Sequence, residues 1–201
     1  MISHNEIKDL AIAKLENNWG NAALAVFVIG IISAFASFIP LASLVIGGPI
    51  SFGIAIYFLR ISRAENVEMS TMFDGFKQFG NAIGATLLMG LIIILGFILL
   101  IVPGIIAILA LSQTYKIMYD EPRLGPIDSI KKSHEMMKGH RGDYLLFVLS
   151  FIGWAFLCLL TLGIGFFFLV PYYSTSSSIY YNQLIQYNDK EIDELGSELV
   201  S

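Results

Sequence analysis

The sequence is poor in cysteine and in charge. A single cysteine, Cys158, excludes a disulfide within the chain. Charged residues make up 14% of the 201 positions, where a soluble domain has about 25%. The net charge of −4 excludes the basic surface of a nucleic-acid-binding protein. Because 56% of the residues are apolar and the mean hydropathy is +0.71, we predict a polytopic membrane protein.

The sequence also lacks the patterns of common enzymes and of a secreted protein. It contains no nucleophile elbow, P-loop or dinucleotide fingerprint. His134 and His140, with scattered carboxylates, do not form a zinc-ligand set. We therefore expect no catalytic residue, no metal and no cofactor. The first 20 residues have no apolar core, so we expect no cleaved signal peptide.

The apolar stretches have the length of membrane spans. A helix of about 20 residues crosses a bilayer, and Pro103–Gly104 would break a longer one. We predict an all-α fold of six transmembrane helices, paired by short turns into three hairpins. The predicted helices are residues 21–39, 42–62, 81–102, 104–119, 142–160 and 163–186.

The charges fall on one side of this arrangement. The turns within the hairpins, at 40–49, 102–104 and 161–165, contain no charged residue, and all 12 basic residues lie elsewhere. The positive-inside rule makes that other side the cytoplasm. We therefore predict a multi-pass protein with both termini in the cytoplasm.

An internal repeat is the most informative pattern. Gly20, Gly80 and Gly139 lie 60 and 59 residues apart, and each opens a hairpin. We predict three parallel repeat units related by an axis along the membrane normal. The units are about 3–63, 66–120 and 126–186. They form one membrane domain, residues 1–187, and an acidic cytoplasmic tail follows at 188–201.

An amphipathic stretch precedes each hairpin. The first begins with a capping box, Ser3 to Glu6, and the third begins at Pro126, which suits the first turn of a helix. The second has five apolar residues at helical spacing, namely Met69, Met72, Phe73, Phe76 and Phe79. All three are too short to span, so we predict helices on the cytoplasmic surface, each followed by a glycine turn into the bilayer.

The sixth predicted helix is unusually polar, because hydroxyl residues follow one another from Tyr172 to Ser178. One interpretation is a polar cleft between the fourth and sixth helices, in which Ser174 and Ser178 share a face. The other is that the hydroxyls bond carbonyls of their own helix, with the tyrosines in the interfacial belt. The candidate cleft residues are Ser112, Gln113, Ser174, Thr175, Ser178 and Asn182.

Charged residues are absent from the middle of the predicted spans. Arg60, Lys116 and Asp120 lie at helix ends, where we expect them to reach the interface, and this disfavours a proton-coupled carrier. A basic cluster on the predicted inner face could bind anionic lipid headgroups or could simply be solvated. Its members are Lys131, Lys132, Lys138, His140 and Arg141.

Several short motifs in the second half resemble one family. They are Lys131-Lys132-Ser133, Met137–His140, Leu149–Trp154, Leu162–Gly165, Pro171-Tyr172, Tyr180-Tyr181 and the turn Ile101–Ile106. The chain resembles the bacterial integral-membrane family called domain of unknown function 975, over roughly residues 5–185. That family is distantly similar to the membrane domain of some glycerophosphodiester phosphodiesterases. The resemblance implies a small protein of a bacterial or archaeal cytoplasmic membrane and transfers no site residue.

Two classes of function remain open. The first is a non-enzymatic membrane module that assists or organises a partner or lipid. The alternative is a transporter, channel or lipid-translocating protein that uses the polar cleft. A membrane-embedded enzyme ranks third, because no nucleophile–base pair is evident. We expect membrane lipids as partners, a membrane or cytoplasmic protein as a further candidate, and no nucleic acid.

Overall fold

The chain folds almost entirely into helices. A computed structural model describes residues 2–16, 18–36 and 40–200, and no strand occurs in these ranges, so the all-α prediction is confirmed. The elements are α1 (His4–Leu15), α2 (Trp19–Ala36), α3 (Pro40–Ser62), η1 (Met69–Gln78), α4 (Phe79–Leu99), α5 (Ile101–Leu111), α6 (Thr114–Asp120), α7 (Pro126–Met136), α8 (Arg141–Leu149), α9 (Ile152–Leu160) and α10 (Phe166–Val200).

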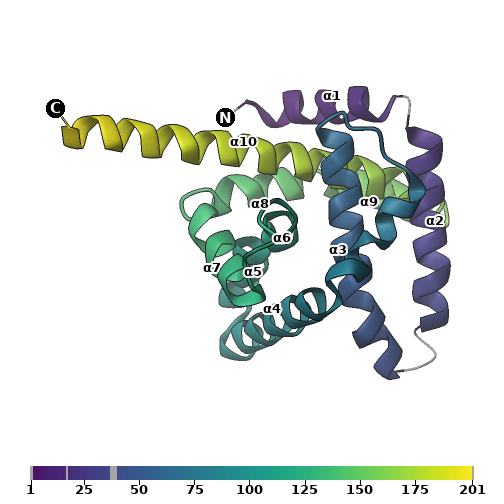
Figure 1. The fold of residues 1–201 in the computed structure, drawn as a ribbon. Coiled ribbons are helices and arrows are strands. Elements are labelled where there is room, and N and C mark those ends of the chain that lie inside the picture. Colours follow the sequence, from purple (N-terminus) through teal and green to yellow (C-terminus); the bar gives the residue numbers. More distant parts are fainter. Residues whose placement is uncertain (1, 17, 37–39, 201) are drawn as a thin grey trace.

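The first helix has the predicted cap. Glu6 N–H donates to Ser3 Oγ over 3.3 Å, and Ser3 N–H donates to Glu6 Oε2 over 2.8 Å. Ile7 and Ala11 are buried because α1 packs along α10 (Figure 1), and Leu15 is buried in a cluster with residues of α2 and α3. Bonds from the Ser3 N–H and hydroxyl lower the pKa of the Glu6 carboxyl. The sequence therefore predicts the start of α1, and of the apolar face Ile7, Leu10, Ala11 and Leu15 that it predicts, only Leu10 is exposed.

The second amphipathic stretch differs from the prediction. It is a 3₁₀ helix, η1, packed along α3, and Phe79 already belongs to α4. The five predicted apolar residues do not share a buried face: Met72 is buried, whereas Phe73, Phe76 and Phe79 are exposed. A Cβ on Gly53 would lie 1.7 Å from Met72 O, and one on Gly75 would lie 1.9 Å from Pro49 O. The glycines allow the two backbones to touch, and the tighter 3₁₀ winding breaks the predicted α-helical face.

Two predicted spans are interrupted, and one is extended. The fourth becomes α5 and α6, with a break at Ser112–Gln113, and the fifth becomes α8 and α9, with a break at Ser150–Phe151. The serine hydroxyls bond carbonyls three residues back, Ser112 to Leu109 O over 2.8 Å and Ser150 to Phe147 O over 2.5 Å, which competes with regular α-helical winding. α10 continues through the predicted boundary of the tail.

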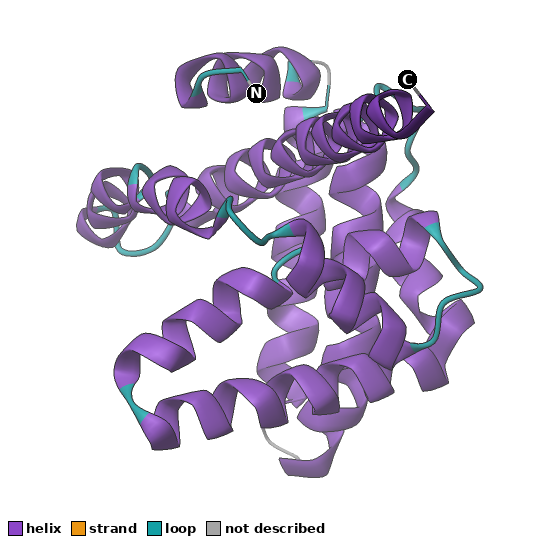
Figure 2. Ribbon diagram, turned by 90° about the vertical axis from the view of Figure 1, so that its left-hand side faces the viewer, coloured by secondary structure: helices purple, strands orange, loops and turns teal. Residues whose placement is uncertain are grey.

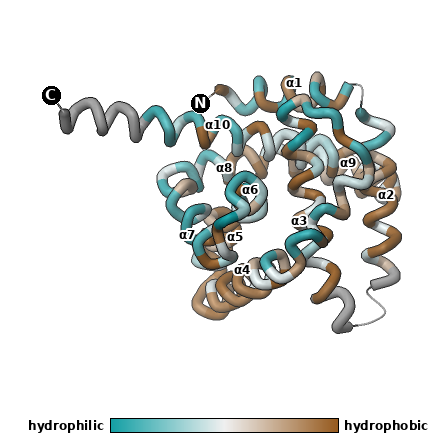
Figure 3. The backbone as a smooth tube through the Cα atoms, in the orientation of Figure 1, coloured by the Kyte–Doolittle hydropathy of each residue, from teal (hydrophilic) through white to brown (hydrophobic). Residues whose placement is uncertain are grey.

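Several helices are long and apolar enough to cross a membrane. Four stretches qualify among the described residues, and a fifth does if α1 and α2, which meet at 93°, count as one bent span. The four are Val45–Ser62, Met69–Leu99, Ile101–Asp120 and Arg141–Leu160. Figure 3 shows this hydrophobic character along α2 and α4. α10, which contains the predicted sixth span, does not qualify, because its hydroxyl and amide residues lower the mean hydropathy.

The hairpins do not share one direction. α2 descends and α3 ascends in Figure 1, so both lie upright, whereas α4 lies across the lower part of the molecule, and Figure 2 shows α4 and α5 lying across it as well. Of the three predicted turn glycines, only Gly139 has a positive φ, +88°, whereas Gly20 and Gly80 lie within the first turns of α2 and α4. The order of elements recurs in the three units, but a common axis is not confirmed.

Candidate functional site

A cavity lined by both hydroxyl-bearing and apolar side chains lies between α3, α8, α10 and the α5–α6 break. Its volume is about 210 Å³. It contains residues from both helices of the predicted cleft, Ser112 from the fourth and Ser174 and Ser178 from the sixth. Its polar lining consists of Ser51, Ser112, Lys116, Tyr144, Tyr173, Ser174, Ser177 and Ser178. The break after α5 brings the start of α6 to face the middle of α10.

Lys116 is the most unusual residue of this cavity. Its side chain is buried, with 6% of the residue exposed, so the prediction that it reaches the interface is wrong. The Nζ atom donates to Ser177 O and Ser177 Oγ, both over 2.8 Å, and to Gln113 Oε1 over 3.0 Å. All three acceptors are neutral, and no ion pair of Lys116 occurs within the described part of the chain. A buried ammonium without a carboxylate is costly.

Two tyrosines extend the polar lining toward α8. The Tyr144 hydroxyl lies 2.9 Å from Ser177 Oγ and 3.5 Å from the Tyr173 hydroxyl. Tyr144 is buried, so its hydroxyl depends on these protein partners. The result is a connected line of side chains from Gln113 through Lys116 and Ser177 to Tyr173.

The two interpretations of the hydroxyl run are not exclusive. Ser178 Oγ donates to Ser174 O over 2.9 Å, and Ser112 bonds within its own helix in the same way, yet these serines line the cavity. Gln113 is fully buried behind it and donates to Ser112 Oγ over 2.9 Å. Thr175 is fully buried outside the cavity lining, and its hydroxyl has no partner among the described residues.

Asn182 was predicted to line the cleft but belongs to a separate cluster. Its Oδ1 accepts from Arg63 Nε over 3.2 Å. The guanidinium of Arg63 also binds both carboxylate oxygens of Asp120, over 2.6 and 2.7 Å, and these bonds raise the pKa of Arg63. The Tyr181 hydroxyl donates to Asp120 Oδ2 over 2.9 Å. We name Arg63, Asp120, Tyr181 and Asn182 the arginine clamp, because they join the ends of α3 and α6 to α10.

The predicted headgroup-binding cations do not point to one site. Lys132 pairs with Glu121, and Lys131 lies 4.0 Å from Asp128. Arg141 contacts the ring and the carbonyl oxygen of His134, and the His140 ring packs edge-on against Tyr187 at 5.0 Å. The Lys138 side chain has no ion pair or hydrogen bond with another described residue. Neighbours on the same surface engage most of these side chains, which gives a common lipid phosphate no preformed cradle.

A histidine–carboxylate pair between α1 and α8 was not predicted from the sequence. His4 Nε2 lies 2.9 Å from Asp143 Oδ1, and the Tyr180 hydroxyl donates to Asp143 Oδ2 over 2.9 Å. Because His4 and Asp143 are 139 residues apart, no local pattern indicates their contact. The pair fixes α1 to α8 and α10, at the rim of a cavity of about 450 Å³ that also contains His140 and Tyr187.

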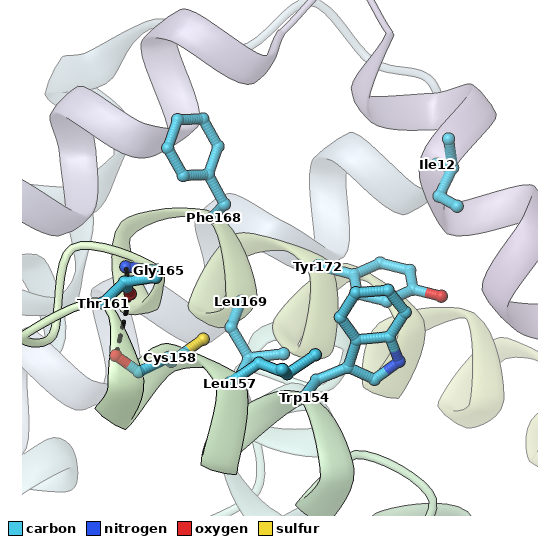
Figure 4. Close-up of a pocket in the computed structure, with 9 residues that line it drawn as sticks. All are labelled: Ile12, Trp154, Leu157, Cys158, Thr161, Gly165, Phe168, Leu169 and Tyr172. Carbon is cyan, nitrogen blue, oxygen red and sulfur yellow. Dashed lines mark hydrogen bonds between the residues drawn. The ribbon is translucent and has the colours of Figure 1, made fainter.

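Two apolar cavities adjoin α10. One, of about 360 Å³, contains Cys158, Trp154 and Tyr172, and Figure 4 shows how side chains of α9 and α10 surround it. The other, of about 270 Å³, lies between α8, α9 and α10 and includes Phe151 and Tyr173. Tyr173 therefore belongs both to this apolar groove and to the cavity at Lys116.

One family model matches nearly the whole chain. It is described as "Protein of unknown function (DUF975)" and matches residues 1–114 and 91–188. No curated protein and no solved structure matches the chain.

Proposed function

The chain belongs to the DUF975 family, whose description assigns no activity, and from that premise we propose that it binds an anionic group inside a membrane-embedded helix bundle, as a carrier of a solute or lipid does. The observation that carries the proposal is Lys116, a buried lysine that lines a cavity and whose hydrogen-bond partners are all neutral. Charged residues inside a membrane protein usually mark a functional site. An anion at Lys116 would balance its charge.

We further propose six spans with both termini in the cytoplasm, with α10 as the last. Its hydropathy is low, but residues 175–181 are all buried, so its polar groups are covered by other helices rather than by lipid. The uncharged hairpin turns support the orientation. In a Cys158→Ala background, Gly47→Cys and Gly196→Cys should react with an impermeant thiol reagent from opposite sides of the membrane. Reaction from the same side would contradict this topology.

Water access to the cavity tests the proposed site. In the Cys158→Ala background, Ser178→Cys should react with a water-soluble thiol reagent, because Ser178 lines the cavity. Ser176→Cys is the matched control, since Ser176 is buried as deeply as Ser178 but does not line the cavity. Equal rates for the two variants in the folded protein would contradict a hydrated cavity, with complete reaction of both after unfolding as the reference.

Anion binding is tested with the same reporter. Acetate or inorganic phosphate should slow the reaction of Ser178→Cys, and Lys116→Met should remove this protection. The variant Lys116→Arg keeps the charge and should retain part of it. Protection that is unchanged in Lys116→Met would contradict the proposal, because the anion would then bind elsewhere.

A second candidate function is a membrane module that engages a protein partner. The C-terminal part of α10 extends beyond the other helices in Figure 1. A projecting helix can bind a groove on a partner. A photo-crosslinking residue in place of Gly196 should then give one discrete product of higher mass in cells, with Ser176 as the buried control position. A monomer band alone would contradict this role.

A further inference from the structure

We infer that the cavity at Lys116 takes a single-chain anionic amphiphile, whose carboxylate or phosphate faces Lys116 and whose chain lies in the apolar groove beside Tyr173. This inference rests on the proposed function, because it requires an anion at Lys116. It goes further by stating the class of ligand. The observation that carries it is Tyr173, which lines both the cavity at Lys116 and the apolar groove.

The polar end of the site supplies the recognition of charge. Lys116 Nζ donates to Gln113 Oε1, Ser177 O and Ser177 Oγ and lies 5.7 Å from the centroid of the Tyr181 ring. No carboxylate among the described residues pairs with it. The hydroxyl of Ser174 lines the same cavity and can donate to a headgroup oxygen, whereas that of Ser178 already donates to Ser174 O and can accept. At about 210 Å³ the cavity suits a compact headgroup better than a large one.

The apolar end begins at Tyr173. Its ring packs edge-on against Phe151, with 5.4 Å between the centroids, while its hydroxyl lies 3.5 Å from that of Tyr144. A tyrosine in this position has an apolar body on one side and a polar tip on the other. Beyond it, Val148, Leu169 and Val170 continue the groove, which has a volume of about 270 Å³. Such a surface favours a hydrocarbon chain attached to the headgroup.

The experiment uses the full chain in nanodiscs of neutral phosphatidylcholine, with Ser178→Cys in the Cys158→Ala background as reporter. The probes are dodecanoate, dodecyl phosphate, dodecanol and acetate. One or both anionic amphiphiles should protect the thiol at a concentration about tenfold or more below that of acetate, because burial of each methylene adds affinity. Comparison of dodecanoate with dodecyl phosphate then distinguishes a carboxylate from a phosphate headgroup.

Two variants separate the ends of the site. Lys116→Met should remove protection by every anion. Ala155→Phe narrows the groove, of which Ala155 is part, and should abolish the advantage of the long chain while leaving protection by acetate. Ala107→Phe on α5 lies outside the groove and should change neither. Thermal unfolding of each variant establishes that it is folded.

The remaining outcomes contradict either the amphiphile or the anion site itself. If acetate and dodecanoate protected the thiol at the same concentration, the ligand would not be an amphiphile, and the anion site would remain. Protection by dodecanol as strong as by dodecanoate would also overturn the inference, since the charge would then contribute nothing. Failure of every anion to protect would overturn both the inference and the proposed function.

Discussion

Arg63 and Lys116 are two cations packed against the same helix, α10, and they differ in what surrounds them. Arg63 has a carboxylate, Asp120, on both of its terminal nitrogens, and its side chain is 30% exposed. Lys116 is more deeply buried, with 6% of the residue exposed, and has only neutral acceptors. A charge therefore costs less at Arg63, which has a charged partner, than at Lys116, which has none.

This difference separates structure from function. The arginine clamp is complete within the chain, since each of its charged atoms has a partner, and it joins three helix segments. Lys116 is satisfied in hydrogen bonds but not in charge. A residue that is incomplete in charge and beside a cavity is better explained by a ligand than by packing.

Removal of the clamp cation should have the largest effect on stability. Arg63→Met leaves Asp120 without its cationic partner, and the side chain of Asp120 is 20% exposed. We expect a loss of about 2–3 kcal/mol in the free energy of unfolding, measured by denaturant in detergent micelles. The double variant with Asp120→Asn should recover part of this loss. A change below about 0.5 kcal/mol would show that the clamp is not structural.

Loss of one hydroxyl from each cluster should have an intermediate effect. Tyr181→Phe removes the bond to Asp120 and should cost about 1 kcal/mol of unfolding free energy. Tyr144→Phe removes the contact with Ser177 beside Lys116 and should alter anion protection of the Ser178→Cys reporter. If Tyr181→Phe altered anion protection as strongly as Tyr144→Phe does, the two clusters would not be separate.

The smallest effect concerns an exposed charge, Glu6. The bonds from Ser3 lower the pKa of the Glu6 carboxyl in the folded chain. The carboxylate therefore stabilises the fold fully above the pKa that Glu6 has in the unfolded chain. This stabilisation is lost as the pH falls through the lower pKa of Glu6 in the folded chain. Ser3→Ala should therefore reduce stability less than Tyr181→Phe does and should flatten the acid side of the pH profile. Ser70→Ala, which changes a hydroxyl near another glutamate, is the control. An unchanged profile in Ser3→Ala would contradict the role of the cap.

Sequence patterns were sufficient where the determinants are local. The cap of α1 depends on residues three positions apart, and the shared face of Ser174 and Ser178 follows from helical spacing. Their approach to Ser112 was predicted because the polar residues of the fourth and sixth helices lie at comparable depth and a hydroxyl gains partners inside the bundle. The all-α class follows from the hydropathy alone.

Other features depend on contacts between distant residues. The Arg63–Asp120 pair spans 57 positions, and the contact between η1 and α3 requires two glycines in different segments. Lys116 stands near the end of an apolar stretch, where an interfacial position is the usual expectation. The break at Ser112–Gln113 instead directs the Lys116 side chain inward. In the sequence, the one local indication of this inward position is a lysine close to a glutamine at the end of an apolar stretch.

The central claim is that the charge of Lys116 serves a ligand and not the fold. The most direct test is the free energy of unfolding of Lys116→Met beside that of Arg63→Met, measured in the same micelles without added anion. Replacement of an unbalanced buried charge by an apolar side chain of similar length should leave stability unchanged or raise it, whereas Arg63→Met should lose about 2–3 kcal/mol. A loss in Lys116→Met as large as that in Arg63→Met would contradict the claim.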